Sequence, residues 1–281
     1  MPFPILDNHM HLQPEGRNVE WVKEFHKAGG THMILSHLPY KNIKIKTGQD
    51  FRKQYEITLK LAEKCRLETD VKVYVMLGPY PGYMAWLWEE LGEEKTVETM
   101  TVGMDIAAEF VQEGKALGIG EIGRPHFPVS PAIWKRSNEV LKYGMKLAKE
   151  NGCTVQLHTE SASTEVWHEL AGFADEASLP RERVVKHYSG PAILDSENFG
   201  LFPSVLASKT NISVAAGKGD RFMMETDFLD DPGRPGAVLA ATTVPKRTKA
   251  YLESGIFTDE MVARIHGDWP RKVYGLDISL D

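Results

Sequence analysis

Pro-Ile-Leu-Asp-Asn-His-Met-His, residues 4–11, is a short apolar run that ends in two histidines. We interpret residues 4–9 as a strand, with His9 and His11 at its end. Because side chains alternate along a strand with a period of two, both imidazoles should project to the same side. Two neutral imidazoles suit a transition metal. A pair of hydrogen-bonded histidines in a turn is the alternative interpretation.

Short apolar runs of this kind alternate with longer amphipathic stretches along almost the whole chain. We expect further strands at residues 31–37, 71–77, 117–122, 153–158, 183–187, 211–216 and 222–227. We expect the main helices at residues 19–28, 49–68, 99–116, 131–150, 202–208, 245–254 and 258–274. Parallel strands joined by helices produce this alternation. Since 281 residues suit one barrel, we predict an α/β fold with a single (β/α)8 TIM barrel over residues 1–281.

One connection does not fit this barrel comfortably. Only residues 217–221 separate the expected seventh and eighth strands, whereas a crossover between parallel strands usually needs about a dozen residues or more. Either the barrel is distorted between strands seven and eight, or the seventh strand is displaced. An aromatic stretch rich in glycine and proline, residues 79–88, follows the third strand and could cover a pocket.

The composition is ordinary for a soluble globular protein, with 42% hydrophobic and 26% charged residues. The net charge of −6 provides no general basic field, which weakens tight, non-specific nucleic-acid binding as the main activity. The first residues do not form a signal segment, and no apolar run approaches the roughly 18 residues of a membrane span. We therefore expect a cytoplasmic protein that does not interact with membranes.

Four other expected strands also end in a potential metal ligand, namely Glu121, His158, His187 and Asp227. In a barrel these ends lie on one face, where barrel enzymes place their chemistry. Each ligand has a structural alternative when taken alone. The carboxylate at residue 121 could pair with a nearby arginine, the histidines could be satisfied core residues, and the aspartate could cap a helix.

Considered together, the strand ends supply four imidazoles and two carboxylates. This set matches two divalent ions that share a bridging carboxylate and a water. The remaining histidines fit such a site less well. His37 and His126 lie near the expected active-face loops. There they could support a ligand or contact the substrate, and having no role is the alternative. We interpret the other four as structural or surface residues: His26, His32, His168 and His266.

These residues resemble the amidohydrolase superfamily, and the TatD-like metal-dependent hydrolases in particular. Five motifs carry the resemblance: His-Met-His at 9–11, Gly-Glu-Ile-Gly at 120–123, Leu-His at 157–158, Lys-His at 186–187 and Glu-Thr-Asp at 225–227. The ending Ala-Arg-Ile-His-Gly-Asp-Trp-Pro-Arg-Lys-Val-Tyr-Gly, residues 263–275, looks like the closing helix of the family. The motifs span nearly the whole chain.

The resemblance implies a role for each ligand. One divalent ion would be held by His9, His11 and Asp227, and the other by His158 and His187. Glu121 would bridge them, in place of the carboxylated lysine of phosphotriesterase-like enzymes. In catalysis Asp227 would orient the attacking hydroxide and accept its proton. Zinc is the first choice of metal, with nickel, manganese, iron and magnesium as alternatives.

The substrate is less strongly specified than the metals. TatD-like nucleases tend to carry an arginine two residues after the strand-five histidine, where this chain has Glu160, and this difference puts DNase activity in doubt. Four cations in the expected active-face loops could replace that arginine, although solvated loop charges are the simpler interpretation: Arg124, Lys218, Arg221 and Arg234. As substrate-binding residues we select His37, Arg124 and His126.

The leading hypothesis is hydrolysis of a phosphoester or phosphodiester bond, in a small molecule or, as in a DNase, in nucleic acid. The near alternative is a lactone, amide or organophosphate hydrolase that uses the same metals. A more distant alternative is a non-catalytic barrel that binds metal or a partner.

Overall fold

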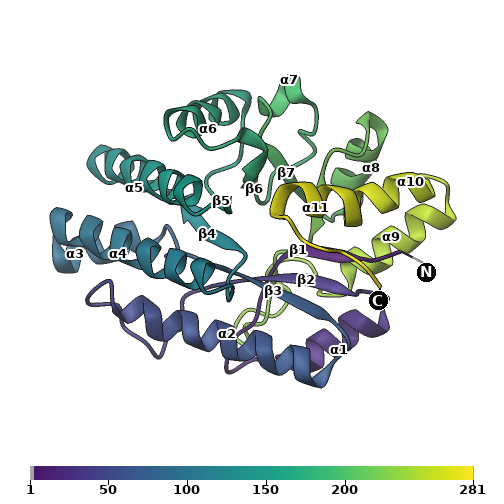
Figure 1. Ribbon diagram of the computed structural model, residues 1–281, viewed down its shortest axis with the longest axis horizontal. Coiled ribbons are helices and arrows are strands. Elements are labelled where there is room, and N and C mark those ends of the chain that lie inside the picture. The colour runs from purple at the N-terminus through teal and green to yellow at the C-terminus, as the bar shows by residue number, and fades with distance from the viewer. Residues whose placement is uncertain (1–2, 281) are drawn as a thin grey trace.

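The strands form a parallel sheet that curls into a barrel (Figure 1) in a computed structural model that describes residues 3–280. Their bounds are β1 (Leu6–His11), β2 (His32–Ser36), β3 (Lys72–Leu77), β4 (Gly118–Gly123), β5 (Thr154–His158), β6 (Val184–Lys186), β7 (Phe202–Leu206), β8 (Met223–Glu225) and β9 (Phe228–Leu229). Each strand from β1 to β7 pairs with the next strand along the chain. The last part of the sheet is divided between β8 and β9. There β8 pairs with β7, while β9 pairs with β1. The chain thus returns to its first strand, and the predicted barrel is confirmed.

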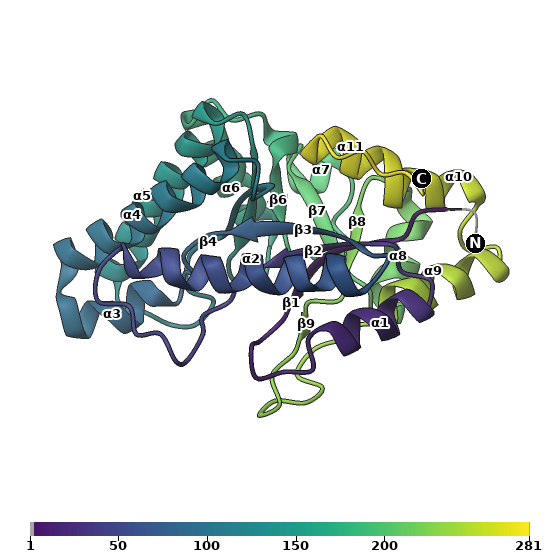
Figure 2. The ribbon, with the colours of Figure 1, turned by 60° about the horizontal axis from the view of Figure 1, so that its bottom comes forward.

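The helices lie around the outside of the sheet (Figures 1 and 2). They are α1 (Val19–Lys27), α2 (Asp50–Glu68), α3 (Tyr83–Leu91), α4 (Glu93–Gln112), α5 (Pro131–Glu150), α6 (Thr164–Glu176), α7 (Asp195–Asn198), α8 (Lys209–Lys218), α9 (Thr243–Glu253), α10 (Asp259–Ala263) and α11 (Trp269–Tyr274). A π-helical turn at Arg264–Asp268 joins the last two. Among the described residues, 3–280, none of the helices is long and apolar enough to cross a membrane.

Helix ends follow ordinary capping chemistry. The Ser130 side chain accepts a hydrogen bond from the backbone N–H of Ile133 at the start of α5, where Pro131 occupies the first helical position. The Thr258 hydroxyl accepts from the Met261 N–H at 3.2 Å and caps α10, as its position in the sequence predicts. Predicted and observed bounds agree exactly for α5.

The prediction for the seventh strand was wrong. Residues 202–206 are strand β7 instead of a helix, and residues 209–218 are helix α8 instead of a strand. The β-branched residues Ile212 and Val214 suggested a strand, but Ser208 caps a helix there and Ile212 is buried on its inner face. Pro203 disfavoured a strand where one in fact forms. With α8 in place, the crossover to β8 has an ordinary length and the barrel needs no distortion.

The core lies between the sheet and the helices. On one side, the fully buried side chains of Phe51 and Tyr55 from α2, Met104 from α4 and Leu141 from α5 pack in one cluster with buried residues of β3 to β5. A second cluster joins α8 and α9 to β7 and β8 on the opposite side of the barrel. These two layers fix the strands and therefore the positions of their ends.

Strand β4 lies unusually close to β5, and its glycines make this possible. A Cβ on Gly118 would lie 2.3 Å from the carbonyl oxygen of Thr154. Gly123 has a φ of +149° and lies so close to β5 that a Cβ would be 2.0 Å from the carbonyl oxygen of His158. The run Gly-Ile-Gly-Glu-Ile-Gly, residues 118–123, is therefore required by the close approach of two backbones.

This close approach predicts the effect of a single added methyl group. Gly118→Ala should destabilise the protein by about 1–3 kcal/mol, because the Thr154 backbone cannot move aside without breaking the sheet. Gly172→Ala in α6 is the matched control: its Cβ would meet nothing within 4 Å, so the helix should gain up to about 1 kcal/mol. Urea unfolding followed by circular dichroism measures both. Equal stability of the two variants would contradict this account of β4.

Candidate metal centre

One group of potential ligands lies at the ends of β1, β4 and β8. His9 Nε2 is 2.6 Å from Oε1 of Glu121, and His11 Nε2 is 3.4 Å from the same oxygen. Asp227 Oδ1 lies 3.3 Å from His11 Nε2. Asp227 sits in the bend between β8 and β9, with a φ of +50°, and its N–H donates to the carbonyl oxygen of His9 at 2.9 Å. The bend that returns the chain to β1 thus also brings Asp227 to the other potential ligands.

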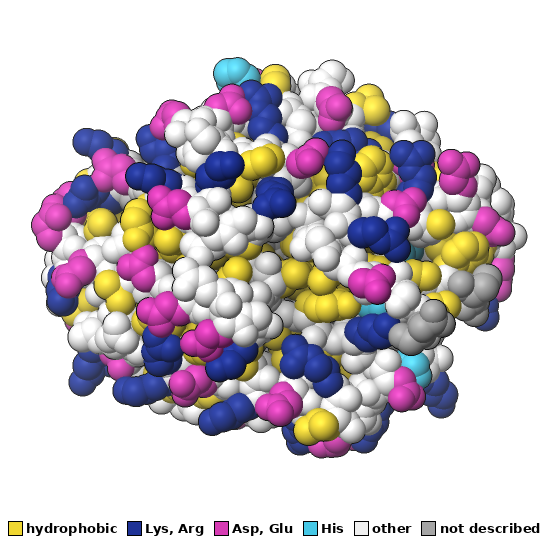
Figure 3. All heavy atoms as spheres, in the orientation of Figure 1, with side chains coloured by type: hydrophobic (Ala, Val, Ile, Leu, Met, Phe, Trp, Pro, Cys, Tyr) yellow, Lys and Arg dark blue, Asp and Glu magenta, His cyan; other side chains and the backbone are white. Residues whose placement is uncertain are grey.

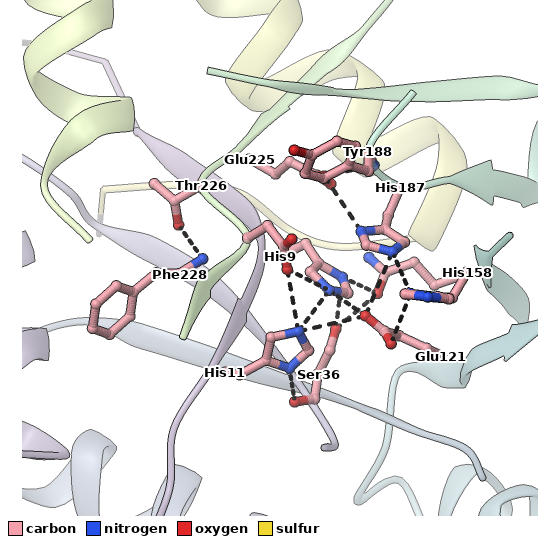
Figure 4. A network of polar contacts seen from close by, with 12 residues as sticks. His9, His11, Ser36, Glu121, His158, His187, Tyr188, Glu225, Thr226 and Phe228 are labelled. Carbon is pink, nitrogen blue, oxygen red and sulfur yellow. Dashed lines mark hydrogen bonds and ion pairs between the residues drawn. The ribbon is translucent and has the colours of Figure 1, made fainter. Parts of the chain in front are cut away.

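A second group shares one of these residues. His158 at the end of β5 and His187 directly after β6 face each other, with His158 Nδ1 2.9 Å from His187 Nε2. The other carboxylate oxygen of Glu121, Oε2, is 3.4 Å from His158 Nδ1. Figure 4 shows the Glu121 carboxylate between the two pairs of imidazoles. In each group, one atom of every side chain lies within 4.8 Å of the others, so each group could hold a metal ion.

Hydrogen bonds fix the orientation of the first two imidazoles. His9 Nδ1 is 2.7 Å from Oε1 of Gln156, an amide whose nitrogen donates to the Asn8 carbonyl. His11 Nδ1 is 3.0 Å from the carbonyl oxygen of Ser36. Because these partners are acceptors, each Nδ1 carries a proton, and each Nε2 points toward the carboxylates, where it holds either a second proton or a lone pair for a metal. The two Nε2 atoms are only 3.1 Å apart, an arrangement that calls for a cation between them.

The pKa values of the cluster also indicate a place for positive charge. Burial alone would raise the pKa of Glu121, but the imidazoles of His158, His187 and His9 hold it well below its ordinary value. Burial alone would lower the pKa of His11, but hydrogen bonds to Asp227 and Glu121 raise it to about 10. Glu121 Oε2 is buried and has no hydrogen-bond partner among residues 3–280. The carboxylates therefore attract positive charge, as a proton or as a metal.

Glu225 is a buried carboxylate of the centre that the sequence analysis missed. Its Oε1 lies 3.4 Å from His187 Nδ1 and accepts the Tyr188 N–H at 2.6 Å, and its other oxygen accepts from Ser204. Burial raises its pKa to about 8. The carboxylate lies beside Nδ1 of His187, where the partners of metal-binding histidines are generally found, although this nitrogen makes no hydrogen bond within residues 3–280. Glu225 and Gln156 each precede a ligand by two residues, so the strand period could have identified both.

The cluster forms the floor of a cavity of about 740 Å³. His11, His158, His187, Glu121 and Asp227 all line it, as does His126. The walls come from residues 38–45, 80–90 and 229–238, so the predicted aromatic stretch does line a pocket. This volume is typical of small-molecule sites.

Comparison with known proteins identifies the family. Residues 6–275 match the family described as TatD related DNase. The chain belongs to this family. An uncharacterized protein of Methanocaldococcus jannaschii is 38% identical over 281 residues, which cover 99% of this chain and 98% of that protein. The chain is thus a metal-dependent hydrolase by family, and the resemblance stated from its motifs is confirmed.

Solved structures share the fold at lower identity. The TatD homolog of Escherichia coli has a TM-score of 0.67 at 19% identity, with 98% of this chain and 100% of that chain covered. A phosphotriesterase homology protein of Escherichia coli, complexed with phosphate in its active site, has a TM-score of 0.61 at 13% identity and covers 98% of this chain and 99% of that one. This TatD family member therefore has the barrel common to both groups.

Two of the three predicted substrate contacts do not reach the cavity of this TatD family chain. His37 is fully buried, with its ring nitrogens 2.9 Å from Thr58 Oγ1 and 3.1 Å from Gln54 Oε1. Arg124 is also buried and pairs with Glu160 and with Glu169. Both residues follow a strand end, but their side chains turn into the packing between sheet and helices. We therefore propose no substrate contact for either.

His126 does line the cavity, and its Nδ1 lies 2.7 Å from His158 Nε2. Among the other candidate cations, Lys218 pairs with Glu197 at 2.6 Å and Arg221 with Asp195 at 3.3 Å, and neither lines the cavity. Arg234 lines the cavity. The structure thus brings the six predicted ligands together, whereas only His126 of the three predicted substrate contacts lines the cavity.

The position of His37 predicts a structural role. His37→Leu should destabilise the fold by about 2 kcal/mol, because two buried hydrogen bonds are lost and only the contacts of Thr58 Oγ1 and Gln54 Oε1 with Tyr40 remain. Burial lowers the pKa of His37 to about 3. Its stabilising contribution is therefore complete above the unfolded-state pKa of about 6.5 and is lost as the pH falls from there toward 3.

Unfolding free energies of the wild type and the variant, measured from pH 8 to pH 5, test this. The difference should be constant above about pH 7 and shrink at lower pH, while bound metal per chain at pH 8 stays unchanged. A variant of normal stability that binds less metal would place His37 in the site instead.

Proposed function

We propose that the chain hydrolyses phosphoester bonds with two divalent ions held by the six-residue cluster. One observation carries the proposal: the Glu121 carboxylate reaches both groups of imidazoles, with Oε1 2.6 Å from His9 and 3.6 Å from His187, and Oε2 3.4 Å from His158. A carboxylate shared in this way suits a bridging ligand between two ions. His9, His11 and Asp227 would complete the first site, and His158 and His187 the second.

The donor set fits such ions. Imidazole nitrogens with carboxylate oxygens suit zinc, and also nickel, manganese or iron. The buried Oε2 of Glu121 and the paired Nε2 atoms of His9 and His11 need a positive partner, which a metal would supply. We propose zinc as the native metal, because four of the six ligands are imidazoles.

The reaction we propose is attack of a water oxygen on the phosphorus atom. Bound divalent ions would lower the pKa of a water and stabilise negative charge on the phosphoryl oxygens. Asp227 would accept the water proton, since its side chain is 16% exposed, whereas that of Glu121, which also lines the cavity, is only 2% exposed. As the new P–O bond forms, the bond to the leaving oxygen breaks, and that oxygen keeps the electron pair and takes up a proton.

A phosphoryl centre is the preferred target for two reasons. The family description names DNases, which cleave phosphodiesters, and the phosphotriesterase homology protein with the same fold holds phosphate in its active site. Lactone, amide and organophosphate hydrolysis remain the alternative, because the same cluster could also polarise a carbonyl oxygen.

The bridging role predicts metal stoichiometry. The purified wild type should hold close to two divalent ions per chain by elemental analysis. Glu121→Gln should hold at most one, because a neutral amide is a poor bridge between two cations. Glu169→Gln, which alters a carboxylate paired with Arg124 outside the cavity, is the control and should keep both. Two tightly bound ions in Glu121→Gln would contradict the proposed bridge.

The proposed role of Asp227 predicts a loss of turnover. The zinc-loaded wild type should release nitrophenol from bis(4-nitrophenyl) phosphate, and Asp227→Asn should lower kcat by about 100-fold or more, because an amide cannot accept the proton. Metal content measured on the same sample separates lost chemistry from lost metal. Hydrolysis of lactones with no activity on the phosphodiester would reject phosphoester hydrolysis and support the alternative.

A further inference from the structure

The cavity above the metal centre is largely aromatic and aliphatic on one side. This side, here called the aromatic wall, consists of Ile43, Ile45, Tyr80, Tyr83, Trp86 and Leu87. Tyr83, Trp86 and Leu87 come from α3, and Ile43 and Ile45 from the loop after β2. An apolar surface of this kind beside the reacting centre is expected to bind an apolar part of the substrate.

The rings of this wall form a continuous series that begins at the metal centre. The Tyr80 ring lies 5.2 Å from the His158 ring in an edge-to-face arrangement. The Trp86 ring lies 5.5 Å from Tyr80, and Tyr83 lies 5.3 Å from Trp86. Trp86 is 52% exposed, although large apolar side chains are usually covered. A planar ring bound against Trp86 would bury this surface next to the centre.

Each lysine and arginine that lines the cavity is paired with a carboxylate. Lys44 Nζ is 2.6 Å from Glu90, and Arg234 Nε is 3.1 Å from Asp231. Lys41 Nζ also contacts Asp231, at 3.5 Å. All five side chains line the cavity, so each cation there has a carboxylate partner in the same wall.

A nucleic-acid strand needs a different surface. Strands are held by a groove of cations that follows successive phosphates, and carboxylates in the path repel them. Figure 3 shows the face that carries the chain ends, where lysine and arginine side chains are interspersed with aspartate and glutamate. On the cavity side, the cations are likewise accompanied by carboxylates. The net charge of the chain is −6. These features favour a compact substrate with one phosphoryl group over a long polyanion.

From these observations we infer the substrate class: a small phosphodiester in which one ester group carries an aromatic ring, seated against Trp86 and Tyr80. This inference rests on the proposed phosphoester hydrolysis. The phosphoryl group lies at the metal centre, and the ring is the retained substituent next to His158. A single-stranded nucleic acid is the competing substrate, and the experiment includes it.

Two matched esters test the ring site. Methyl 4-nitrophenyl phosphate and phenyl 4-nitrophenyl phosphate have the same leaving group and differ only in the retained substituent. The zinc-loaded wild type should hydrolyse the phenyl ester with a kcat/KM about tenfold higher or more, the size of one buried aromatic contact. Trp86→Ala should lose this preference, and Trp86→Phe should keep most of it. Leu67→Ala, at an exposed apolar residue outside the cavity, should behave as wild type.

Binding measured without turnover separates this inference from the proposed function. Calorimetry on the metal-loaded protein should show phenylphosphonate binding about tenfold more tightly than methylphosphonate, with the difference lost in Trp86→Ala. If neither ester is hydrolysed but this difference holds, phosphoester hydrolysis fails and the ring site stands. Equal affinities, or equal kcat/KM values for the two esters, would overturn the ring site. Cleavage of a single-stranded oligonucleotide with a higher kcat/KM than the phenyl ester would overturn the substrate class.

Discussion

The Glu121 carboxylate lies at the centre of four imidazoles, with only 1% of the residue exposed. An ionised carboxylate in such a place is expensive unless cations surround it. The surrounding residues are arranged to hold such a cation: Gln156 and Ser36 accept from Nδ1 of His9 and His11, so that the two Nε2 atoms and the carboxylate converge on one point. The charge at this one position therefore accounts for the polar residues buried around it.

The barrel brings the strand ends together, and this convergence places the four imidazoles around Glu121. The glycines of β4 let that strand approach β5 closely enough for Glu121 and His158 to meet. The division of the last strand into β8 and β9 puts Asp227 in a bend beside β1. Chemistry and specificity thus reside in different parts of the chain. Strand ends supply the proposed metal ligands, while the loops after β2, β3 and β9 supply the cavity walls.

Much of this could be predicted from the sequence, for a physical reason. A polar side chain at the end of an apolar run is a local pattern, and the fold brings such ends together, so the clustering of these six residues could be predicted. The seventh strand was missed because Ile212 and Val214 favour a strand by propensity, while the capping of α8 by Ser208 and its packing decide otherwise. The side chains of His37 and Arg124 point into the core because they bind Gln54 and Glu160 there. These partners are distant in sequence, so the direction of the two side chains could not be predicted.

The central claim is that one carboxylate holds two metal ions. Anomalous scattering from crystals of the zinc-loaded protein, recorded on both sides of the zinc absorption edge, tests it most directly. The account predicts two peaks, one beside His9 and His11 and one beside His158 and His187, with the Glu121 carboxylate between them. A single peak that leaves one pair of imidazoles without metal, or peaks that Glu121 does not touch, would contradict it.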